Sequence, residues 1–300
     1  MKLLNFGSLN YDHVYRTNHF VQPKETLPCL SYIRNFGGKG LNQSIASAKA
    51  GLEVYHAGRV GMDGDDLIAY LNQYNVHTDY LMKDISVPTG HAIIEVCNGQ
   101  NRIITNGGAN HHISKEQIAD TISAFDSNDI LLIQNEINFT GEIISAASEK
   151  GMKIVFNLAP FTEDIFNYPL HLVDIIIVNE VEAAALCKTD STDPDELIKL
   201  LLNQYPKQTI LLTLGDQGSY CLRNGETLFR ECQKVEVVDT TAAGDTYSGF
   251  FLSSYYLFDP ENIKIAMDLA TIASGITVSR EGAAIAIPSL KEVMTSYENL

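Results

Sequence analysis

One segment of the sequence, residues 239–250, brings together small residues, a glycine and a carboxylate where an apolar helical pattern begins. The successive backbone N–H groups of such a helix start, with no bulky side chain in front of them, form a site for an anion. Asp245 sits in this first turn, where its charge would stabilise the helix by about 0.3–1 kcal/mol. The same carboxylate is well placed to take a proton from a hydroxyl that attacks a bound phosphate. The segment alone is compatible with both roles.

A second glycine-rich segment, residues 35–43 (Asn-Phe-Gly-Gly-Lys-Gly-Leu-Asn-Gln), also leads into a helical pattern. It is not a Walker A loop, because the spacing before it and the Ser or Thr after it are absent. Its glycines permit a ligand to approach the backbone closely, and Lys39 and Asn42 can donate to hydroxyl groups. A glycine-rich turn between a strand and a helix, without any ligand, explains the same residues.

Polar residues follow apolar strand patterns at three further places. Asn10 and Asp12 follow the first strand, Asn179 and Glu182 follow a later one, and Glu136 ends another. Ligands of doubly wound sheets collect at the carboxyl ends of strands. The first pair could therefore face a polar substrate, and the second could hold hydrated Mg²⁺. Polar turns, a helix cap and a solvated carboxylate are the plainer explanations.

The elements that must position these residues alternate along the chain. Continuous apolar runs predict buried strands at residues 2–7, 54–60, 130–134, 154–157, 175–179 and 209–214. Helical patterns cover residues 40–50, 65–74, 115–124, 141–150, 180–188, 194–204, 243–257 and 263–278. Strands that alternate with helices through short connections indicate a mostly parallel, doubly wound α/β sheet with helices on both faces.

Two regions depart from this alternation, at residues 12–34 and 86–106. Both have strand patterns with few helical signals, and Asn98-Gly99 marks a hairpin in the second. We expect them to form a small β-sheet beside the main one, as a lid on a single domain spanning residues 1–300.

Composition limits the partners. The 300 residues carry a net charge of −16, which disfavours nucleic acid and anionic membranes as partners. Five cysteines without a CxxC pair suit a reducing compartment. No signal peptide and no apolar run of about 20 residues is apparent, so a cytoplasmic protein is expected. Such an acidic chain would have to bind a polyphosphate through local amides, a few cations and a metal.

Taken together and in this order, the segments resemble the ribokinase-like (PfkB) carbohydrate kinases over nearly the whole chain. Residues 37–43 are similar to the N-terminal signature of that family, and residues 239–245 closely match its C-terminal signature. The resemblance implies a three-layer α/β/α domain whose β-sheet lid often supports a homodimer. It also implies ATP as co-substrate, Mg²⁺, and K⁺ as an activating monovalent cation.

The resemblance implies a role for each matching residue. Asp245 would be the base and would contact the sugar. The sugar hydroxyls would also be bound by Asn10, Asp12, Gly38, Lys39, Asn42 and Glu136. The amides that receive the developing charge would be those of Ala242, Ala243 and Gly244. Asn179 and Glu182 would govern Mg²⁺ and phosphate, with Glu182 on the metal. The nucleotide site would include Thr213, Gly215 and Gly218. The K⁺ site would use Asp239, Thr241, Thr277, Arg280 and Gly282.

Three positions depart from the family pattern. Ala286 stands where a serine hydroxyl near the cation is usual, so the K⁺ site could be weaker or lined by carbonyls alone. Lys24 replaces a common glycine near the lid, and the turn at residues 157–160 has fewer prolines than usual. None of these changes removes a catalytic group.

The predicted reaction is the ATP-dependent phosphorylation of the primary hydroxyl of a small sugar, D-ribose above all, to give D-ribose 5-phosphate. Lys39 with Gln43 favours this substrate over fructose, a nucleoside or a sugar phosphate, which stay open as alternatives within the family. A sugar or nucleotide sensor without catalytic activity is the alternative from another class. The retention of Asp245 with the whole anion segment argues against a sensor.

Overall fold

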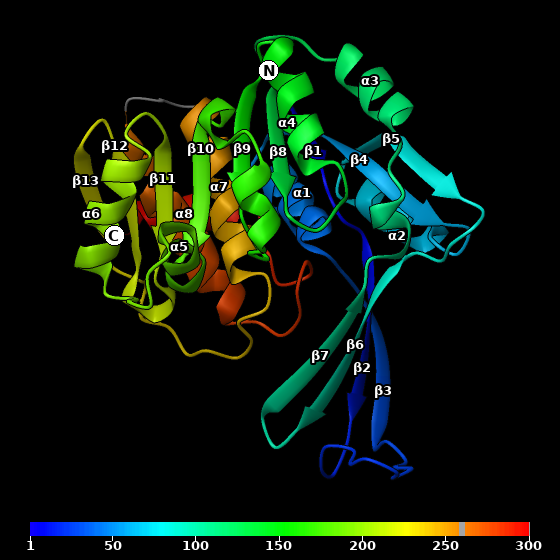
Figure 1. Cartoon of the computed structure of the whole chain (residues 1–300). Coiled ribbons are helices and arrows are strands. Elements are labelled where there is room, and N and C mark those ends of the chain that lie inside the picture. The colour runs from blue at the N-terminus through cyan, green and yellow to red at the C-terminus, as the bar shows by residue number, and fades with distance from the viewer. Residues whose placement is uncertain (258–261, 300) are drawn as a thin grey trace.

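The computed structural model describes residues 1–257 and 262–299, and its centre is a nine-stranded sheet (Figure 1). The strands lie in the order β13-β12-β11-β10-β9-β8-β1-β4-β5. All neighbours from β11 to β5 are parallel, and β12 and β13 are antiparallel additions at one edge. The bounds are β1 Lys2–Phe6, β4 Glu53–Gly61, β5 His77–Asp84, β8 Ile130–Gln134, β9 Lys153–Asn157, β10 Ile175–Asn179, β11 Thr209–Thr213, β12 Ser219–Arg223 and β13 Glu226–Arg230.

Helices cover both faces of this sheet, and each face has its own apolar core. One core includes side chains of α1 Lys39–Lys49, α2 Asp65–Gln73, α7 Ala243–Leu257, α8 Ile263–Val278 and α9 Leu290–Glu298. The other includes side chains of α3 Lys115–Ser123, α4 Thr140–Glu149, α5 Glu180–Cys187 and α6 Pro194–Gln204. Short 3₁₀ turns are η1 Gly108–His111, η2 Glu163–Asn167, η3 Leu170–Leu172 and η4 Gly215–Gln217. The predicted three-layer α/β/α arrangement is confirmed.

Polar caps fix where several helices begin. Asn179 and Glu182 form a reciprocal capping box at the start of α5, and Ser289 with Glu292 does the same for α9. The side chain of Asp193 caps α6, whose first residue is a proline. The α5 box places the start of that helix immediately after β10, at the predicted site residues Asn179 and Glu182.

The lid is a separate four-stranded sheet that projects from the body (Figure 1). Its strands are β2 Asn10–Arg16, β3 Ser31–Gly37, β6 Gly90–Cys97 and β7 Gln100–Asn106, in the order β3-β2-β6-β7. The β6–β7 turn is the predicted one, since Asn98 and Gly99 have φ of 49° and 76°, as a tight hairpin turn requires. The first lid region, predicted at residues 12–34, contains parts of two strands, and residues 17–30 between them hold no strand.

Sequence reasoning missed three strands of the main sheet and one helix. β5 is an edge strand with alternating exposure, and β12 and β13 form an antiparallel hairpin at the other edge. Neither has the continuous apolar pattern of a strand that is covered on both faces. The helix α9 lies on the surface with one fully buried side chain, Val293. In the described residues, no helix is long and apolar enough to cross a membrane.

Candidate active site

The predicted site residues gather where the strand order reverses. β1 lies between β4 and β8, so the chain leaves it toward one edge and later returns to build the other. Crevices outside the carboxyl ends of strands at such a point are the usual ligand sites of doubly wound sheets. Ser8, after β1, and Glu136, after β8, meet here, because the Ser8 hydroxyl donates to the Glu136 carboxylate.

The glycine-rich segment at residues 35–43 packs directly against this strand end. The backbone N–H of Lys39, the first residue of α1, donates to Glu136 Oε2 at 2.9 Å. A Cβ on Gly40 would lie 2.4 Å from the backbone nitrogen of Ser8, and Gly38 has a φ of 98°. Both positions therefore require glycine, one for close approach and one for its left-handed backbone. The signature keeps the start of α1 in contact with β1.

Asp245 is held from two sides by α1. The side-chain amide of Asn42 donates to Asp245 Oδ2 at 3.0 Å, and that of Gln43 donates to Oδ1 at 2.8 Å. Asp245 is 8% exposed, and both amide residues are buried. Asn42 Oδ1 is buried and meets no hydrogen-bond partner in the described part of the chain. The carboxylate is fixed in orientation and keeps lone pairs for a further donor.

The backbone before Asp245 leaves amides without partners. Ala242 adopts a φ of 60°, which is uncommon for a residue with a side chain and costs about 1–3 kcal/mol unless the surrounding structure holds it. Within residues 1–257 and 262–299, no acceptor meets the N–H groups of Gly244 and Asp245. A Cβ on Gly244 would contact nothing within 4 Å, so the loop is open in front of these amides. This geometry suits an anion.

Two adjoining cavities meet at this loop. The smaller, about 220 Å³, is lined by Lys39, Asn179, Glu182 and Asp245 together with the Ala242, Ala243 and Gly244 loop. The larger, about 570 Å³, is lined by Gly215 and Gly218, by residues of the 231–237 segment and by α8. Thr213, Thr240, Ala243 and Gly244 line both. A ligand can thus extend from the larger cavity to Asp245.

In the smaller cavity the Lys39 ammonium lies among carboxylates. Burial alone would lower the pKa of Lys39, but Asp245, Glu136 and Glu182 outweigh it, so this pKa is raised and the ammonium stays charged. Burial raises the pKa of Glu182, against the opposing effect of its capping contact and of Lys39. Burial, and then the charge of Glu136, raises the pKa of Asp12 to about 6. An incoming polyanion would find Lys39 and the open amides at this point.

Similarity to known proteins decides what this site belongs to. The chain matches the pfkB family carbohydrate kinases over residues 1–290. The chain belongs to this family of carbohydrate kinases. It is 35% identical to a ribokinase from Staphylococcus aureus, with 97% of this chain and 98% of that one covered. It is therefore a sugar kinase that binds ATP.

Solved structures of family members agree in fold over the full length. A ribokinase from Thermotoga maritima is 32% identical, with a TM-score of 0.84 and 100% of both chains covered. A ribokinase from Arabidopsis thaliana, solved with ribose and ATP, is 27% identical with a TM-score of 0.88 and covers 98% of this chain and 97% of its own. The lid and the nine-stranded body of this kinase are thus those of the family.

The kinase family's Asn-x-x-Glu pair serves the fold as well. Asn179 Oδ1 accepts from the N–H of Glu182 at 2.8 Å, and Glu182 Oε2 accepts from the N–H of Asn179 at 2.9 Å. The capping box uses Oε2 of Glu182, which also lines the smaller cavity. Among the described residues, no group of three or more His, Cys, Asp or Glu could hold a metal ion by itself.

The segment before α7 is tied to the loop after α8. Asp239 Oδ1 accepts from the N–H and the hydroxyl of Thr241, at 2.9 and 2.6 Å, and its Oδ2 accepts from the N–H of Gly282 at 3.1 Å. These bonds hold the pKa of Asp239 below its usual range although partial burial opposes them. Thr277 donates within the helices instead, and the Arg280 side chain pairs with Glu292.

The lid contributes Asn10 and Asp12 from β2. A Cβ on Gly37 would lie 2.1 Å from Asp12 Oδ2, so the carboxylate lies against the glycine of β3. Asn110 donates to Asn10 Oδ1 at 2.8 Å and accepts from the N–H of Leu9 at 3.0 Å. Sequence reasoning missed Asn110, because a lone asparagine in a polar loop has no local signal that links it to a residue 100 positions away.

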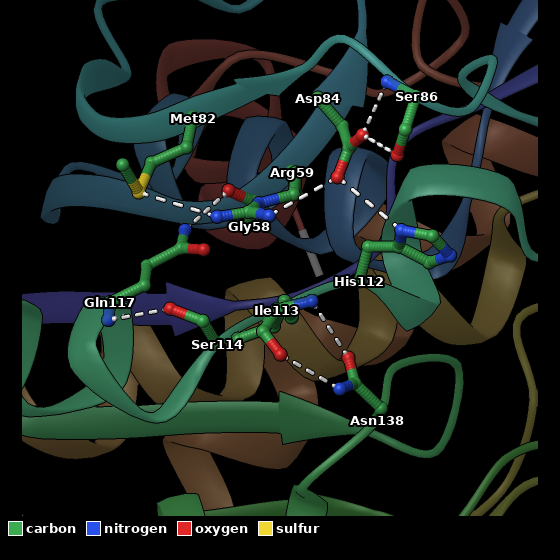
Figure 2. Close-up of polar contacts among 10 residues, drawn as sticks. All are labelled: Gly58, Arg59, Met82, Asp84, Ser86, His112, Ile113, Ser114, Gln117 and Asn138. Carbon is green, nitrogen blue, oxygen red and sulfur yellow. Dashed lines mark hydrogen bonds and ion pairs between the residues drawn. The ribbon is translucent and has the colours of Figure 1, made fainter.

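A polar cluster fixes the chain where it enters the lid (Figure 2). Asp84, the last residue of β5, accepts from the N–H and the hydroxyl of Ser86 at 2.8 and 2.5 Å. Its other oxygen lies 3.2 Å from the Arg59 guanidinium and 3.3 Å from His112 Nδ1. Hydrogen bonds from Ser86, and then Arg59, hold the pKa of Asp84 well below its usual range, so this carboxylate is ionised. β6 therefore begins from a fixed point.

Proposed function

We propose that this kinase transfers the γ-phosphoryl group of ATP to the primary hydroxyl of D-ribose, giving D-ribose 5-phosphate and ADP. The observation that carries the proposal is the double amide clamp on Asp245, placed beside Lys39 and the unpartnered N–H groups of its own loop. The similarity to proteins named ribokinase supports ribose as the sugar.

The sugar would lie between the lid and the end of β1. Its hydroxyls would meet Asn10 and Asp12 from β2, Gly38 and Lys39 from the glycine-rich turn, and Glu136 after β8. Asn42 Oδ1, which is buried and unpartnered in the described residues, would accept from a sugar hydroxyl. That contact would remove the cost of an unsatisfied buried acceptor, about 1–3 kcal/mol.

The chemistry needs one proton acceptor and a stabilised leaving charge. Asp245 accepts the proton of the sugar hydroxyl while the sugar oxygen forms a bond to the γ-phosphorus. The bond from that phosphorus to the bridging oxygen breaks, and its electron pair leaves with ADP. The unpartnered N–H groups of Gly244 and Asp245, with the Lys39 ammonium, stabilise the negative charge that develops. Ala242 and Ala243 shape this loop, and the N–H of Ala243 donates to the carbonyl oxygen of Thr240 at 3.3 Å instead. The lid excludes water from the transfer.

The nucleotide would occupy the larger cavity, with Thr213, Gly215 and Gly218 at its wall and its phosphates directed to the open amides. Mg²⁺ fits the remaining donor set, because it keeps most of its water shell and needs few carboxylates besides the nucleotide phosphates. Glu182 would hold it, through the oxygen that its cap leaves available, with Asn179 at its side. When bound, Mg²⁺ neutralises phosphate charge.

Two further features of the family are proposed for this chain. A monovalent cation, K⁺, would be held by Asp239 and by oxygens of Thr241, Thr277, Arg280 and Gly282. The donor chemistry fits, because Asp239 stays ionised and its Oδ2 accepts only one of two possible hydrogen bonds. The exposed aliphatic side chains of the lid, including Ile33, Ile103 and Ile104, favour a homodimer through that sheet.

Steady-state kinetics with a sugar panel test the proposal. We expect D-ribose to give the highest kcat/KM among ribose, fructose, adenosine and fructose 1-phosphate. Asp245→Asn should fold and bind ATP but lose at least about 10²-fold in turnover, the low end for a positioned general base. If another sugar wins by tenfold or more, ribose is the wrong substrate. If Asp245→Asn stays within a few-fold of wild type, Asp245 is not the base.

A further inference from the structure

A continuous network of buried polar side chains runs through the core behind Asp245. Gln43 links Asp245 to Gln134 at the end of β8, because Gln134 Nε2 donates to Gln43 Oε1 at 2.8 Å. The same Nε2 donates to Asn5 Oδ1 at 3.0 Å in β1. Gln43, Gln134 and Asn5 are each 0% exposed. Apolar residues surround them in both strands, Lys-Leu-Leu-Asn-Phe and Ile-Leu-Leu-Ile-Gln.

The polar network ends at a neutral histidine, His56. The Asn5 amide donates to Ser44 Oγ at 2.8 Å, and Ser44 Oγ lies 2.7 Å from His56 Nδ1. His56 Nε2 lies 3.2 Å from the carbonyl oxygen of Gly7, which can only accept, so Nε2 carries the hydrogen and Nδ1 accepts from Ser44. Complete burial lowers the pKa of His56 to about 4, so the imidazole is neutral near pH 7.

The side-chain amides of Gln134 and Gln43 each satisfy their neighbours in only one orientation. If Gln134 turned by 180°, its carbonyl oxygen would face the carbonyl oxygens of Gln43 and Asn5. If Gln43 turned, its carbonyl oxygen would face the Asp245 carboxylate. Gly7 leaves room for this arrangement, since a Cβ there would lie 2.6 Å from Gln134 Oε1. The order of donors therefore presents an N–H, and never an oxygen, to Asp245.

A buried polar network contributes less reliably to stability than apolar side chains would. A buried amide without partners costs about 1–3 kcal/mol, and leucine or valine at these positions would pack without that risk. One acceptor, Gln134 Oε1, has no partner among the described residues, so the network is not even fully satisfied. Its polarity is not explained by stability alone.

We propose that Gln43 and, through it, Gln134 are positioning residues for phosphoryl transfer, which hold the Asp245 carboxylate in the orientation that accepts the sugar proton. The inference rests on the proposed function, since it assigns Asp245 the role of base. Gln43 fixes Oδ1, and Asn42 fixes Oδ2 beside the predicted sugar site. Gln134 has no contact with Asp245 of its own and acts by setting the orientation of the Gln43 amide.

Gln43→Met tests the first step, because it keeps the length of the side chain and removes the amide. We expect kcat for ribose to fall about tenfold while KM for ATP stays within twofold. Lys39 and Glu182, which line the cavity beside Asp245, and Glu136 beside Lys39 are unchanged in this variant.

Gln134→Met tests the second step and serves if Gln43→Met does not fold. It should lower kcat without changing KM for ATP. The double variant should be no slower than Gln43→Met alone, because Gln134 acts only through Gln43. Losses in kcat that add in the double variant would overturn the inference, because they would show that Gln134 acts by a route of its own. An unchanged kcat in a folded Gln43→Met protein would overturn it as well.

Ser47→Ala is the matched control. Ser47 lies one turn after Gln43 on α1, is equally buried, and its hydroxyl has no partner in the described part of the chain. It should leave kcat and KM for ATP as in wild type. Asp245→Asn separates the two proposals: if it retains activity, the assigned base is wrong, whereas a dead Asp245→Asn beside a wild-type-like Gln43→Met sinks only the positioning role.

Discussion

At the scale of the residue, the proposed sugar contact of Asp12 would make substrate binding depend on pH. Its carboxylate lies against Gly37 at the base of the lid, and burial followed by the charge of Glu136 raises its pKa to about 6. Above pH 6 the ionised group would accept hydrogen bonds from sugar hydroxyls through both oxygens, and below it one oxygen carries a proton and the acceptor capacity falls. Acidification should therefore weaken sugar binding before it affects the nucleotide.

We expect KM for ribose to rise about tenfold between pH 7 and pH 5, because each unit below the pKa reduces the ionised fraction about tenfold. KM for ATP should change little over that interval. Asp12→Asn is the control, since it should bind ribose weakly at every pH and show no such rise. A KM for ribose that is flat in wild type would mean that the sugar does not depend on the charge of Asp12.

At the scale of the element, the loop before α7 depends on its tie to the loop after α8. Asp239 makes that tie through Thr241 and Gly282, and Ser274 of α8 donates to the carbonyl oxygen of Ala243 at 3.1 Å. K⁺ beside Asp239 would reinforce the geometry of the open amides and add no reacting group. Its effect should therefore appear in turnover.

We expect K⁺ to activate the enzyme at constant ionic strength, with a bulky organic cation as the replacement. Ala286 is buried and offers no hydroxyl, so the apparent affinity should be weaker than with a serine there. Asp239→Ala should abolish the activation. A flat response to K⁺ in wild type would contradict the site, and activation that survives in Asp239→Ala would locate the ion elsewhere.

The elements around the site were predictable to different degrees. β1, β8 and β10 were found because strands buried on both faces are continuously apolar. The hairpin of β12 and β13 was missed, although Asn224-Gly225 between them is the same turn signal that was recognised at Asn98-Gly99. Half-exposed edge strands have a mixed pattern that resembles a loop.

The candidate site residues could be named from the sequence because glycine-rich turns and carboxylates at strand ends are local patterns. The contacts that hold them are not local. Gln43 meets Asp245 from 202 positions away and Gln134 from 91. A single sequence specifies such pairs only through the packed fold, so Gln43 was visible as part of a motif whereas its role was not. Asn5 and Gln134 were the available signal, as amides inside otherwise apolar strands.

At the scale of the whole molecule, one carboxylate of α2, that of Asp66, contacts two strands of the lid. Asp66 accepts from the hydroxyl of Tyr11 in β2 and lies 2.5 Å from the Arg34 guanidinium of β3. The guanidinium also lies over the Tyr11 ring, 4.6 Å from its centre. The Arg34–Asp66 pair is too exposed to contribute much alone, but Tyr11 is buried and its hydroxyl also donates to the carbonyl oxygen of Asp63.

Asp66→Ala removes the contacts of this carboxylate with Tyr11 and Arg34 at once. It should allow the lid to sample orientations that do not contact the sugar. We expect KM for ribose to rise roughly 5- to 30-fold, as for the loss of one or two such hydrogen bonds. KM for ATP should remain within twofold, because the larger cavity is lined by body segments alone. Asp65→Ala is the matched control, since Asp65 is adjacent, exposed and paired with Lys83 of β5 instead of the lid. Equal changes in both KM values, or an Asp65→Ala variant as impaired as Asp66→Ala, would show that α2 supports the site as a whole and that Asp66 does not set the lid.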